Sequence, residues 1–205
     1  MTGGKPHWDA VYAVRDEQAL TWFEATPEVS LRLVTRFAAP EQEVIDVGGG
    51  ASRLVDGLLA RGYGRATVLD VSGEALAISR KRLAEAADRV RWIEADVTRW
   101  QPDRAYALWH DRAVFHFLTD PGARADYLSR MKQALETGGH AILATFAEDG
   151  PETCSGLPVA RYSPEALSLE IADRLPFLPV ASERHVHVTP MGREQKFQVS
   201  VFRRL

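Results

Sequence analysis

A short apolar run that breaks into three consecutive glycines constrains the fold of this chain more than any other feature. Residues 43–52 read E-V-I-D-V-G-G-G-A-S, with Asp46 near the end of the run and Gly48, Gly49 and Gly50 after it. A buried strand followed by a glycine-rich turn and a helix brings a nucleotide-like ligand against bare backbone. The stretch therefore predicts the first strand, turn and helix of an α/β fold.

A second apolar run, residues 66–69, ends in Asp70, and Val71 follows it. The order of glycine turn, helix, second strand and acid is that of one βαβ unit. A carboxylate at the end of the second strand can accept hydrogen bonds from both ribose hydroxyls. Asp70 is therefore predicted to bind a ribose, with Val71 beside it.

The spacing of the glycines indicates which nucleotide is bound. Dinucleotide enzymes favour G-x-G-x-x-G, whose third glycine lets the helix pack under a pyrophosphate. Counted from Gly48, that position is Arg53, and the pattern here is D-x-G-x-G-x-S from Asp46 to Ser52. An acid at position 46 suits a ligand with an ammonium and a sulfonium better than it suits a pyrophosphate. A nicotinamide-dependent oxidoreductase is disfavoured, also because no Tyr-x-x-x-Lys pair is recognisable.

Composition narrows the class of protein further. The 205 residues suffice for one domain, and a net charge of −3 without a basic run argues against a nucleic-acid partner. The single cysteine, Cys154, excludes an internal disulfide and a zinc site built on several thiolates. No apolar run approaches the roughly 20 residues of a membrane span, and residues 1–6 contain no apolar signal segment. We expect a cytoplasmic protein without a membrane partner or a metal site.

The pattern from Asp46 to Ser52 resembles the first motif of the class I S-adenosylmethionine (SAM) methyltransferases. That resemblance implies a doubly wound, Rossmann-like, seven-stranded and mostly parallel sheet, with helices on both faces and a C-terminal antiparallel hairpin. It implies SAM as the cofactor and S-adenosylhomocysteine as its product. In this class an acid or amide after the third strand reads the adenine amino group. The cofactor-binding residues expected on these grounds are Asp46, Gly48, Gly49, Gly50, Ser52, Asp70, Val71, Asp96, Val97 and His110.

We expect a single domain over residues 1–205, with three segments. Residues 1–40 are predicted to form a helical lid, since Trp8, Tyr12, Trp22 and Phe23 put four aromatics outside the sheet. These rings either pack the segment onto the domain or cover the ligand, and the two roles are compatible. Residues 41–146 are predicted to form the cofactor-binding core. Residues 147–205 are predicted to supply a substrate loop, a helix and the hairpin.

A fourth strand is predicted over residues 105–109, and the densest polar cluster of the chain follows it. Together with the P-G-x-R start of the next helix, the sequence from Trp109 to Ala113 is similar to the thiopurine methyltransferase group. The tellurite-resistance methyltransferases look related in the same way. The resemblance covers about residues 44–165. It departs at His110, which is an extra residue, and at the loop 154–158, which lacks the usual proline-rich sequence. The identity of the acceptor therefore does not transfer.

The cluster also contains the candidate catalytic residues. Methyl transfer from a sulfonium is an in-line displacement, in which the protein aligns the nucleophile and excludes water. A thiol or chalcogen acceptor needs little help from a base, whereas an amine or hydroxyl needs one. His116 and His110 are the candidate bases, although a histidine in an apolar segment is more often a packed side chain. The candidate acceptor-binding residues are Trp8, Trp22, Asp111, Arg112 and Cys154.

Arg112 suits an anionic group of the acceptor, because its planar fork matches carboxylates and oxyanions. The alternative for Arg112 is a salt bridge to Asp111 or Asp120. His185 and His187 alternate on a predicted strand, a spacing that occurs in metal sites. Without a third ligand, solvent exposure or packing is favoured for both.

The favoured function is methyl transfer to a small molecule, with a thiol, another chalcogen or a small anion as the acceptor. The alternative on the same cofactor is a protein lysine methyltransferase, which would need an open acidic groove rather than an enclosed apolar pocket. A nucleic-acid methyltransferase is disfavoured by the absence of an N-P-P-Y-type turn after the fourth strand. A ligand-binding relative without catalysis is the last alternative.

Overall fold

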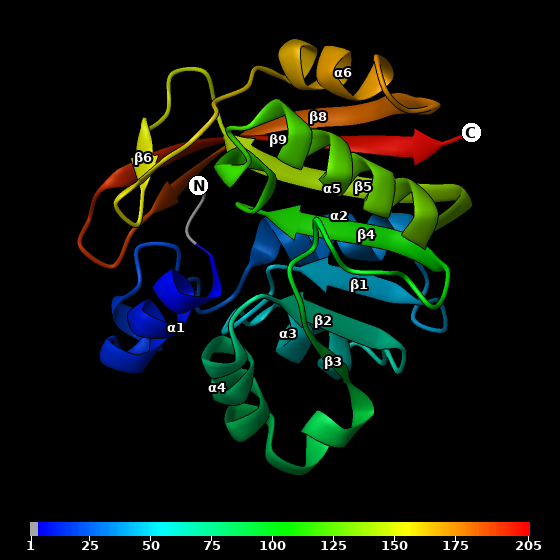
Figure 1. The fold of residues 1–205 in the computed structure, drawn as a ribbon. Coiled ribbons are helices and arrows are strands. Elements are labelled where there is room, and N and C mark those ends of the chain that lie inside the picture. The colour runs from blue at the N-terminus through cyan, green and yellow to red at the C-terminus, as the bar shows by residue number, and fades with distance from the viewer. Residues whose placement is uncertain (1–3) are drawn as a thin grey trace.

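A seven-stranded sheet forms the centre of the computed structural model, which describes residues 4–205; the first three residues of the predicted lid lie outside that range. The strand order is β3-β2-β1-β4-β5-β9-β8 (Figure 1). The first five strands are parallel, and β9 runs antiparallel to both β5 and β8. The strands are β1 (Val44–Val47), β2 (Ala66–Asp70), β3 (Arg91–Glu94), β4 (Tyr106–Arg112), β5 (Leu135–Phe146), β8 (Phe177–Val188) and β9 (Glu194–Arg204). The predicted doubly wound fold with its C-terminal hairpin is confirmed.

Helices cover both faces of this sheet, as predicted. In Figure 1, α5 and α6 lie in front of the sheet, and α2 and α3 lie behind it. The α-helices are α1 (Lys5–Val14), α2 (Glu28–Phe37), α3 (Leu54–Ala60), α4 (Gly73–Leu83), α5 (Pro121–Ala134) and α6 (Pro164–Ala172). The 3₁₀ helices are η1 (Glu17–Ala19), η2 (Ala84–Arg89) and η3 (Phe115–Phe117). Within residues 4–205, no helix combines the length and apolar character needed to cross a membrane.

The two faces of the sheet have separate hydrophobic cores, because successive side chains of a strand point to opposite faces. On β4, Trp109 packs with Tyr127 and Met131 of α5. Its neighbour Leu108 packs on the other face with the core that includes residues of α2 and α3. This alternation decides where the polar residues that follow on the same strand can point.

Strand β4 is longer than predicted. The polar residues that follow Trp109 were expected to lie after the strand, but β4 continues through Arg112. Its backbone is paired on both sides, since His110 lies opposite Asp46 of β1 and Arg112 lies opposite Ala144 of β5. Hydrogen bonding to two neighbouring strands thus keeps the polar sequence extended, although its composition is that of a loop.

Two helices of the core begin in different ways. The Ser72 side chain accepts a hydrogen bond from the backbone N–H of Ala75 at the start of α4. Helix α2 begins at Glu28 after Pro27, without a side-chain cap. The burial of Leu31 and Val34 fixes α2 instead.

Candidate active site

Two adjoining pockets open where the parallel strands end, the usual place for ligands in a doubly wound sheet. With the open solvent at their mouths included, the first encloses about 960 Å³ and the second about 570 Å³. Two elements lie beside these strand ends (Figure 1): helix α1, and the small hairpin of β6 (Thr153–Cys154) and β7 (Leu157–Pro158). The predicted site residues that line the first pocket are Trp8, Trp22, Gly48, Asp70, Val71, Asp96, Val97, Arg112 and Cys154. Those that line the second are Trp22, Asp46, Gly48, Gly49, Ser52, His110 and Arg112.

The turn after β1 accepts only glycine at its critical positions. Gly48 has φ +68°, and a Cβ atom there would lie 2.0 Å from Cγ2 of Val114. Gly50 has φ +37°, and its Cβ would lie 2.8 Å from Oδ2 of Asp70. Both values of φ are disfavoured for residues with a side chain. The turn therefore brings bare backbone up to the carboxylate at the end of β2. This arrangement can bind a nucleoside.

His110 holds Asp46 in place at the second pocket. Its Nδ1 lies 2.7 Å from Oδ1 of Asp46, and its Nε2 lies 2.9 Å from Oγ of Ser30 on α2. In the neutral ring, Nδ1–H donates to the carboxylate and Nε2 accepts from the serine hydroxyl. The imidazole is 2% exposed, and both nitrogens are engaged. This geometry supports a positioning role for His110 rather than the predicted role as a base.

Asp70 is a buried carboxylate whose charge is sensitive to pH near neutrality. Burial raises its pKa to about 7, and the nearby Asp46 contributes to the increase. The backbone N–H of Ser72 donates to Oδ1 of Asp70 at 2.8 Å and limits the shift. The ionised carboxylate can accept hydrogen bonds from a ligand, whereas the protonated form retains a reduced capacity to accept them.

Asp96 and Ser52 combine a local structural role with a position on a pocket. Asp96 accepts hydrogen bonds from the backbone N–H and the hydroxyl of Thr98, at 2.9 and 2.7 Å, and so closes the turn after β3. The Ser52 hydroxyl accepts from the N–H of Leu54 at the start of α3, at 3.1 Å. Both hydrogen bonds from Thr98 end on Oδ1 of Asp96, so Oδ2 of that carboxylate remains available to the first pocket.

Aromatic side chains of the N-terminal segment form one wall of the first pocket. The Trp8 ring lies 5.1 Å from that of Phe117 and 5.9 Å from that of Trp22, and Tyr12 lies 6.1 Å from Trp22. All these ring pairs meet edge to face, which is a favourable arrangement. The two proposed roles of these aromatics, packing and covering the ligand, are therefore compatible in the structure as well.

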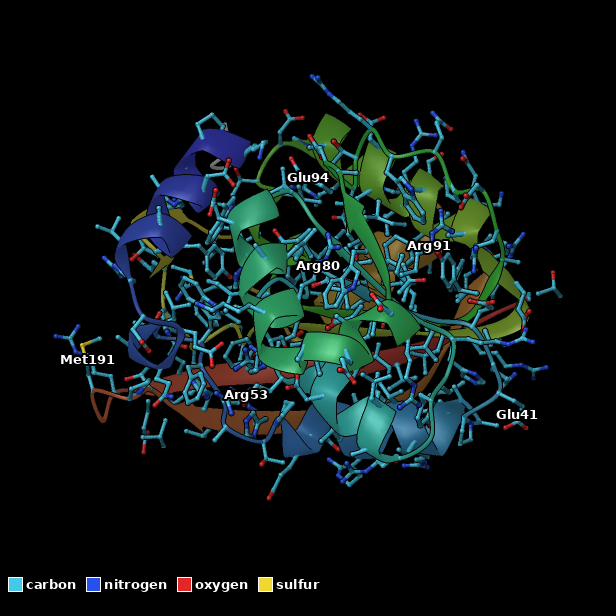
Figure 2. All side chains as sticks on the ribbon, turned by 90° about the horizontal axis from the view of Figure 1, so that it is seen from below. Glu41, Arg53, Arg80, Arg91, Glu94 and Met191 are labelled. Carbon is cyan, nitrogen blue, oxygen red and sulfur yellow. The ribbon has the colours of Figure 1, made fainter. Side chains whose placement is uncertain are left out.

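Ion pairs attach the same segment to the core. Lys5 at the start of α1 lies 2.8 Å from Glu94 at the end of β3. After α1, Glu17 contacts both Arg53, at 2.5 Å, and Arg82, at 2.6 Å. Figure 2 labels Glu94 and Arg53 and shows α1 beside α4. The segment is thus held at both ends of α1.

Arg112 is held by the N-terminal segment rather than by either predicted acid. Its Nη1 donates to the carbonyl of Trp22 at 3.1 Å, and its Nη2 lies 3.4 Å from Oε1 of Glu24. The guanidinium also lies over the ring of Phe197, 5.0 Å from its centre. Burial lowers the pKa of Arg112, and Glu24 opposes that shift. The salt bridge to Asp111 or Asp120, which was the alternative role for Arg112, is not formed, and Arg112 pairs with Glu24 instead.

The two histidines of β8 pack against the same carboxylate. His185 Nε2 lies 3.6 Å and His187 Nδ1 lies 3.5 Å from Oε1 of Glu24. The other nitrogen of His187, Nε2, donates to the carbonyl of Thr21 at 2.8 Å. Burial raises the pKa of Glu24, but the hydrogen bond with His187 and the charge of Arg112 outweigh that effect and hold the pKa below its usual value. Packing, which the sequence favoured for both histidines, accounts for their positions.

Cys154 lines the first pocket from the β6–β7 hairpin. Burial raises the pKa of its thiol to about 11, so the group is uncharged at neutral pH. A neutral thiol is a weak nucleophile. Its place on the pocket fits contact with an acceptor, as predicted, without a covalent role.

Asp111 does not line either pocket. It is fully buried on the opposite face of β4 from Arg112, where the Tyr127 hydroxyl donates to Oδ2 at 2.5 Å. The backbone N–H groups of Val114 and Phe115 donate to the same carboxylate. Burial raises its pKa to about 6. The alternation along β4 therefore gives Asp111 a structural role, and the geometry does not support it as a residue that binds an acceptor.

His116 also lies outside both pockets. It is fully buried against Phe117 and Phe146, and its Nδ1 accepts a hydrogen bond from the N–H of Phe146 at 3.3 Å. Burial lowers its pKa to about 3, with a contribution from Arg112. A buried histidine that remains neutral and lacks access to a pocket is not placed to remove a proton, so the geometry does not support the predicted catalytic role.

Sequence reasoning missed several residues of the site. Tyr12 and Phe117 line the first pocket, and Glu24 and Ser30 line the second. The aromatic density before residue 24 was a signal for Tyr12. Glu24 and Ser30 carry no local signal, because their partners come from β4 and β8.

A comparison with known families agrees with this geometry. Residues 44–139 match the sequence model of the family described as "Methyltransferase domain". The matched stretch comprises 96 of the 205 residues, a little under half of the chain. The match begins at the first residue of β1 and ends within β5, so it spans the strands and turns that surround both pockets.

Two curated proteins are similar in sequence to part of this chain, and both are much longer than the aligned region. The eEF1A lysine and N-terminal methyltransferase of Bos taurus is 22% identical over 153 residues, which cover 71% of this chain and 22% of the relative. Nodulation protein S of Rhizobium fredii is 29% identical over 96 residues, which cover 47% of this chain and 54% of the relative. The chain thus spans about a fifth and about half, respectively, of these relatives.

Several solved structures of other proteins share the whole fold. A protein solved in work on the conversion of a disulfide bond into a thioacetal group during echinomycin biosynthesis has a TM-score of 0.76, with 17% identity and coverage of 98% and 92% of the two chains. The N-methyltransferase NodS of Bradyrhizobium japonicum has a TM-score of 0.74, with 16% identity and coverage of 98% and 99%. The 1,6-didemethyltoxoflavin-N1-methyltransferase of Burkholderia thailandensis has a TM-score of 0.70, with 21% identity and coverage of 98% of this chain and 83% of that one. At these identities the likeness establishes the shared fold.

The buried, neutral His116 predicts a loss of stability in acid. Its pKa of about 3 in the folded protein lies below the usual 6.5 or so, so the unfolded chain binds the proton first as the pH falls. Between about pH 6.5 and 3, this group therefore lowers the free energy of unfolding by up to about 1.4 kcal/mol per pH unit. Urea unfolding of the wild type and of His116→Asn, which retains an acceptor for the Phe146 N–H, should show a shallower decline in the variant. Parallel declines would contradict the assignment.

Proposed function

We propose that the protein is a SAM-dependent methyltransferase that acts on a small-molecule acceptor. The observation that carries the proposal is the side-chain-free turn at Gly48–Gly50, with the carboxylates of Asp46 and Asp70 on either side and a pocket next to each. NodS and the toxoflavin-pathway enzyme, which share the fold, were solved with S-adenosylhomocysteine. Their bound product supports the assignment of the cofactor by analogy.

The residues of the two pockets suit the two ends of that cofactor. Asp70 is assigned to the ribose hydroxyls, and Asp96 with Val97 to the adenine. Asp46, held by His110, is assigned to the ammonium of the methionine part, next to the backbone of Gly48 and Gly49. When bound, SAM supplies a methyl group that is activated by the positive charge on its sulfur.

The acceptor side of the first pocket is largely aromatic. Trp8, Trp22, Phe117 and Leu118 form an apolar surface there, with Cys154 beside them. The acids of the two pockets already have partners or assigned roles, since Glu24 pairs with Arg112 and Asp46 with His110. A pocket with a mainly aromatic, apolar lining fits a small acceptor better than the side chain of a lysine, which favours an acidic groove.

The side chains that could move a proton also bear on the choice of acceptor. His116 is remote from the pockets, His110 is engaged at both nitrogens, and Cys154 is a neutral thiol. The protein would then align the acceptor and exclude water, while the nucleophile ionises without a strong base. This supports a thiol or another chalcogen, in keeping with a place in the thiopurine and tellurite-resistance group.

Arg112 remains the group suited to an anionic part of the acceptor, although Glu24 already neutralises it. We also propose that residues 1–40 form a lid over the ligand, and that the protein is located in the cytoplasm. The location rests on the single, unpaired Cys154.

The alternative acceptor is a protein lysine, favoured by the similarity to the eEF1A lysine and N-terminal methyltransferase over 71% of this chain. The aromatic lining of the first pocket, which includes Trp8 and Phe117, counts against it.

The pKa of Asp70 predicts a pH-dependent affinity for SAM. Because the ionised carboxylate is the form that accepts both ribose hydroxyls, the Kd should be constant above about pH 7 and should rise below it. The rise should approach tenfold per pH unit, which is about 1.4 kcal/mol. Isothermal titration calorimetry checks this dependence. Asp70→Asn is the matched variant: its affinity for SAM should be about 10- to 100-fold weaker than that of the wild type and should not change with pH. A Kd for the wild type that does not change across neutrality would contradict the ribose assignment.

An assay for S-adenosylhomocysteine tests the function directly. Wild-type protein and SAM are incubated with aromatic and aliphatic thiols, selenium and tellurium oxyanions, small acids and a pool of lysine peptides. We expect product with a small thiol or chalcogen acceptor and none with the peptides, and Asp70→Ala serves as the cofactor-binding control. Turnover with the peptides alone would overturn the small-molecule assignment.

A further inference from the structure

The two pockets meet at four residues that line both of them: Tyr12, Trp22, Gly48 and Arg112. We call this set the seam. On the proposed function, which this inference depends on, the adenosine lies in the first pocket and the methionine part in the second. The sulfur joins these two parts of the cofactor covalently, so it must lie at the seam.

The seam contains a feature that does not suit a sulfonium. Arg112 is a largely buried cation, with 16% of its side chain exposed. Like charges in a poorly hydrated site repel each other, and a sulfonium has no hydrogen-bond donor with which to offset that repulsion. A site that prefers the charged cofactor to its uncharged product therefore needs a negative charge that balances Arg112.

Glu24 is the acid placed to supply that charge. Its Oε1 lies 3.4 Å from Nη2 of Arg112, and its side chain is 18% exposed, so the pair is poorly screened by solvent. Asp46 also attracts Arg112, but its Oδ1 is bound to His110 and it is assigned to the cofactor ammonium. The other charged or titratable groups that face Glu24 are His185 and His187 of β8.

We propose that Glu24 is a specificity-determining residue, which neutralises Arg112 and so lets the seam favour the sulfonium of SAM over the uncharged sulfur of S-adenosylhomocysteine. Glu24 acts on the ligand through Arg112, and it need not touch the cofactor. The preference matters for turnover, because an enzyme that binds its product as tightly as its cofactor is inhibited by that product.

A purely structural role predicts a different result. Glu24 also ties the segment after α1 to β8 through its two histidine neighbours. If that were its only role, Glu24→Gln would loosen the segment over both pockets and weaken SAM and S-adenosylhomocysteine by the same factor. The ratio of the two dissociation constants therefore separates the two roles, whereas a loss of activity would not.

The experiment measures Kd for SAM and for S-adenosylhomocysteine by isothermal titration calorimetry at about pH 8, where Asp70 with its pKa of about 7 is mainly ionised. For Glu24→Gln we expect the Kd of SAM to rise by about tenfold, while that of S-adenosylhomocysteine changes by less than about twofold. Glu183→Gln is the matched control. It removes another carboxylate paired with an arginine, Arg32, outside the pocket linings, and should leave the ratio unchanged.

Two further variants keep the test decisive if Glu24→Gln folds poorly. Arg112→Met removes the cation and leaves Glu24, so the ratio should shift by about tenfold in favour of SAM. The double variant Glu24→Gln with Arg112→Met removes both charges, so the ratio of the two dissociation constants should return to that of the wild type. A double-mutant cycle expresses this result as a coupling between the two residues.

The outcomes distinguish this inference from the proposed function. Equal weakening of both ligands in Glu24→Gln, or an unchanged ratio in Arg112→Met, overturns the role of Glu24 and leaves SAM binding standing. A wild-type protein that binds neither ligand overturns the proposed function, and the inference with it.

Discussion

The close packing of neighbouring side chains against the glycine backbone after β1 is the constraint on which the rest of the site depends. Gly48 leaves no room for a Cβ atom beside Val114, and Gly50 leaves none beside the Asp70 carboxylate. Because the turn is so tight, β1 and β2 end with their acids close to the same stretch of bare peptide. Asp46 and Asp70 owe their positions to this packing, and the two pockets form on either side of it.

Strand alternation then distributes the polar residues of β4. His110 and Arg112 point to the face shared with α2 and the N-terminal segment, where they meet Ser30 and Glu24. Asp111 points to the other face and is bound by Tyr127 of α5. Three consecutive polar residues thus acquire three separate roles: one orients an acid of the site, one stabilises the turn into η3, and one places a positive charge where the pockets meet.

The local sequence pattern was sufficient to predict the fold and the glycine turn after β1. Hydrophobic runs, three glycines and the acids at 46 and 70 lie within one βαβ unit. The catalytic candidates were harder to judge, because burial decides their chemistry. His116 lies among Phe117 and Phe146, and Phe146 comes from β5. Glu24 acquires its role from residues on β4 and β8, and no short-range pattern indicates such a contact.

The central claim is that one ligand spans both pockets across the glycine turn. A crystal structure of the protein grown with S-adenosylhomocysteine tests it most directly. The account predicts continuous ligand density from Asp96 to Asp46, with the ribose hydroxyls within hydrogen-bond distance of Asp70 and the sulfur beside Tyr12, Trp22 and Arg112. A nucleoside bound elsewhere, or with its ribose away from Asp70, would contradict it.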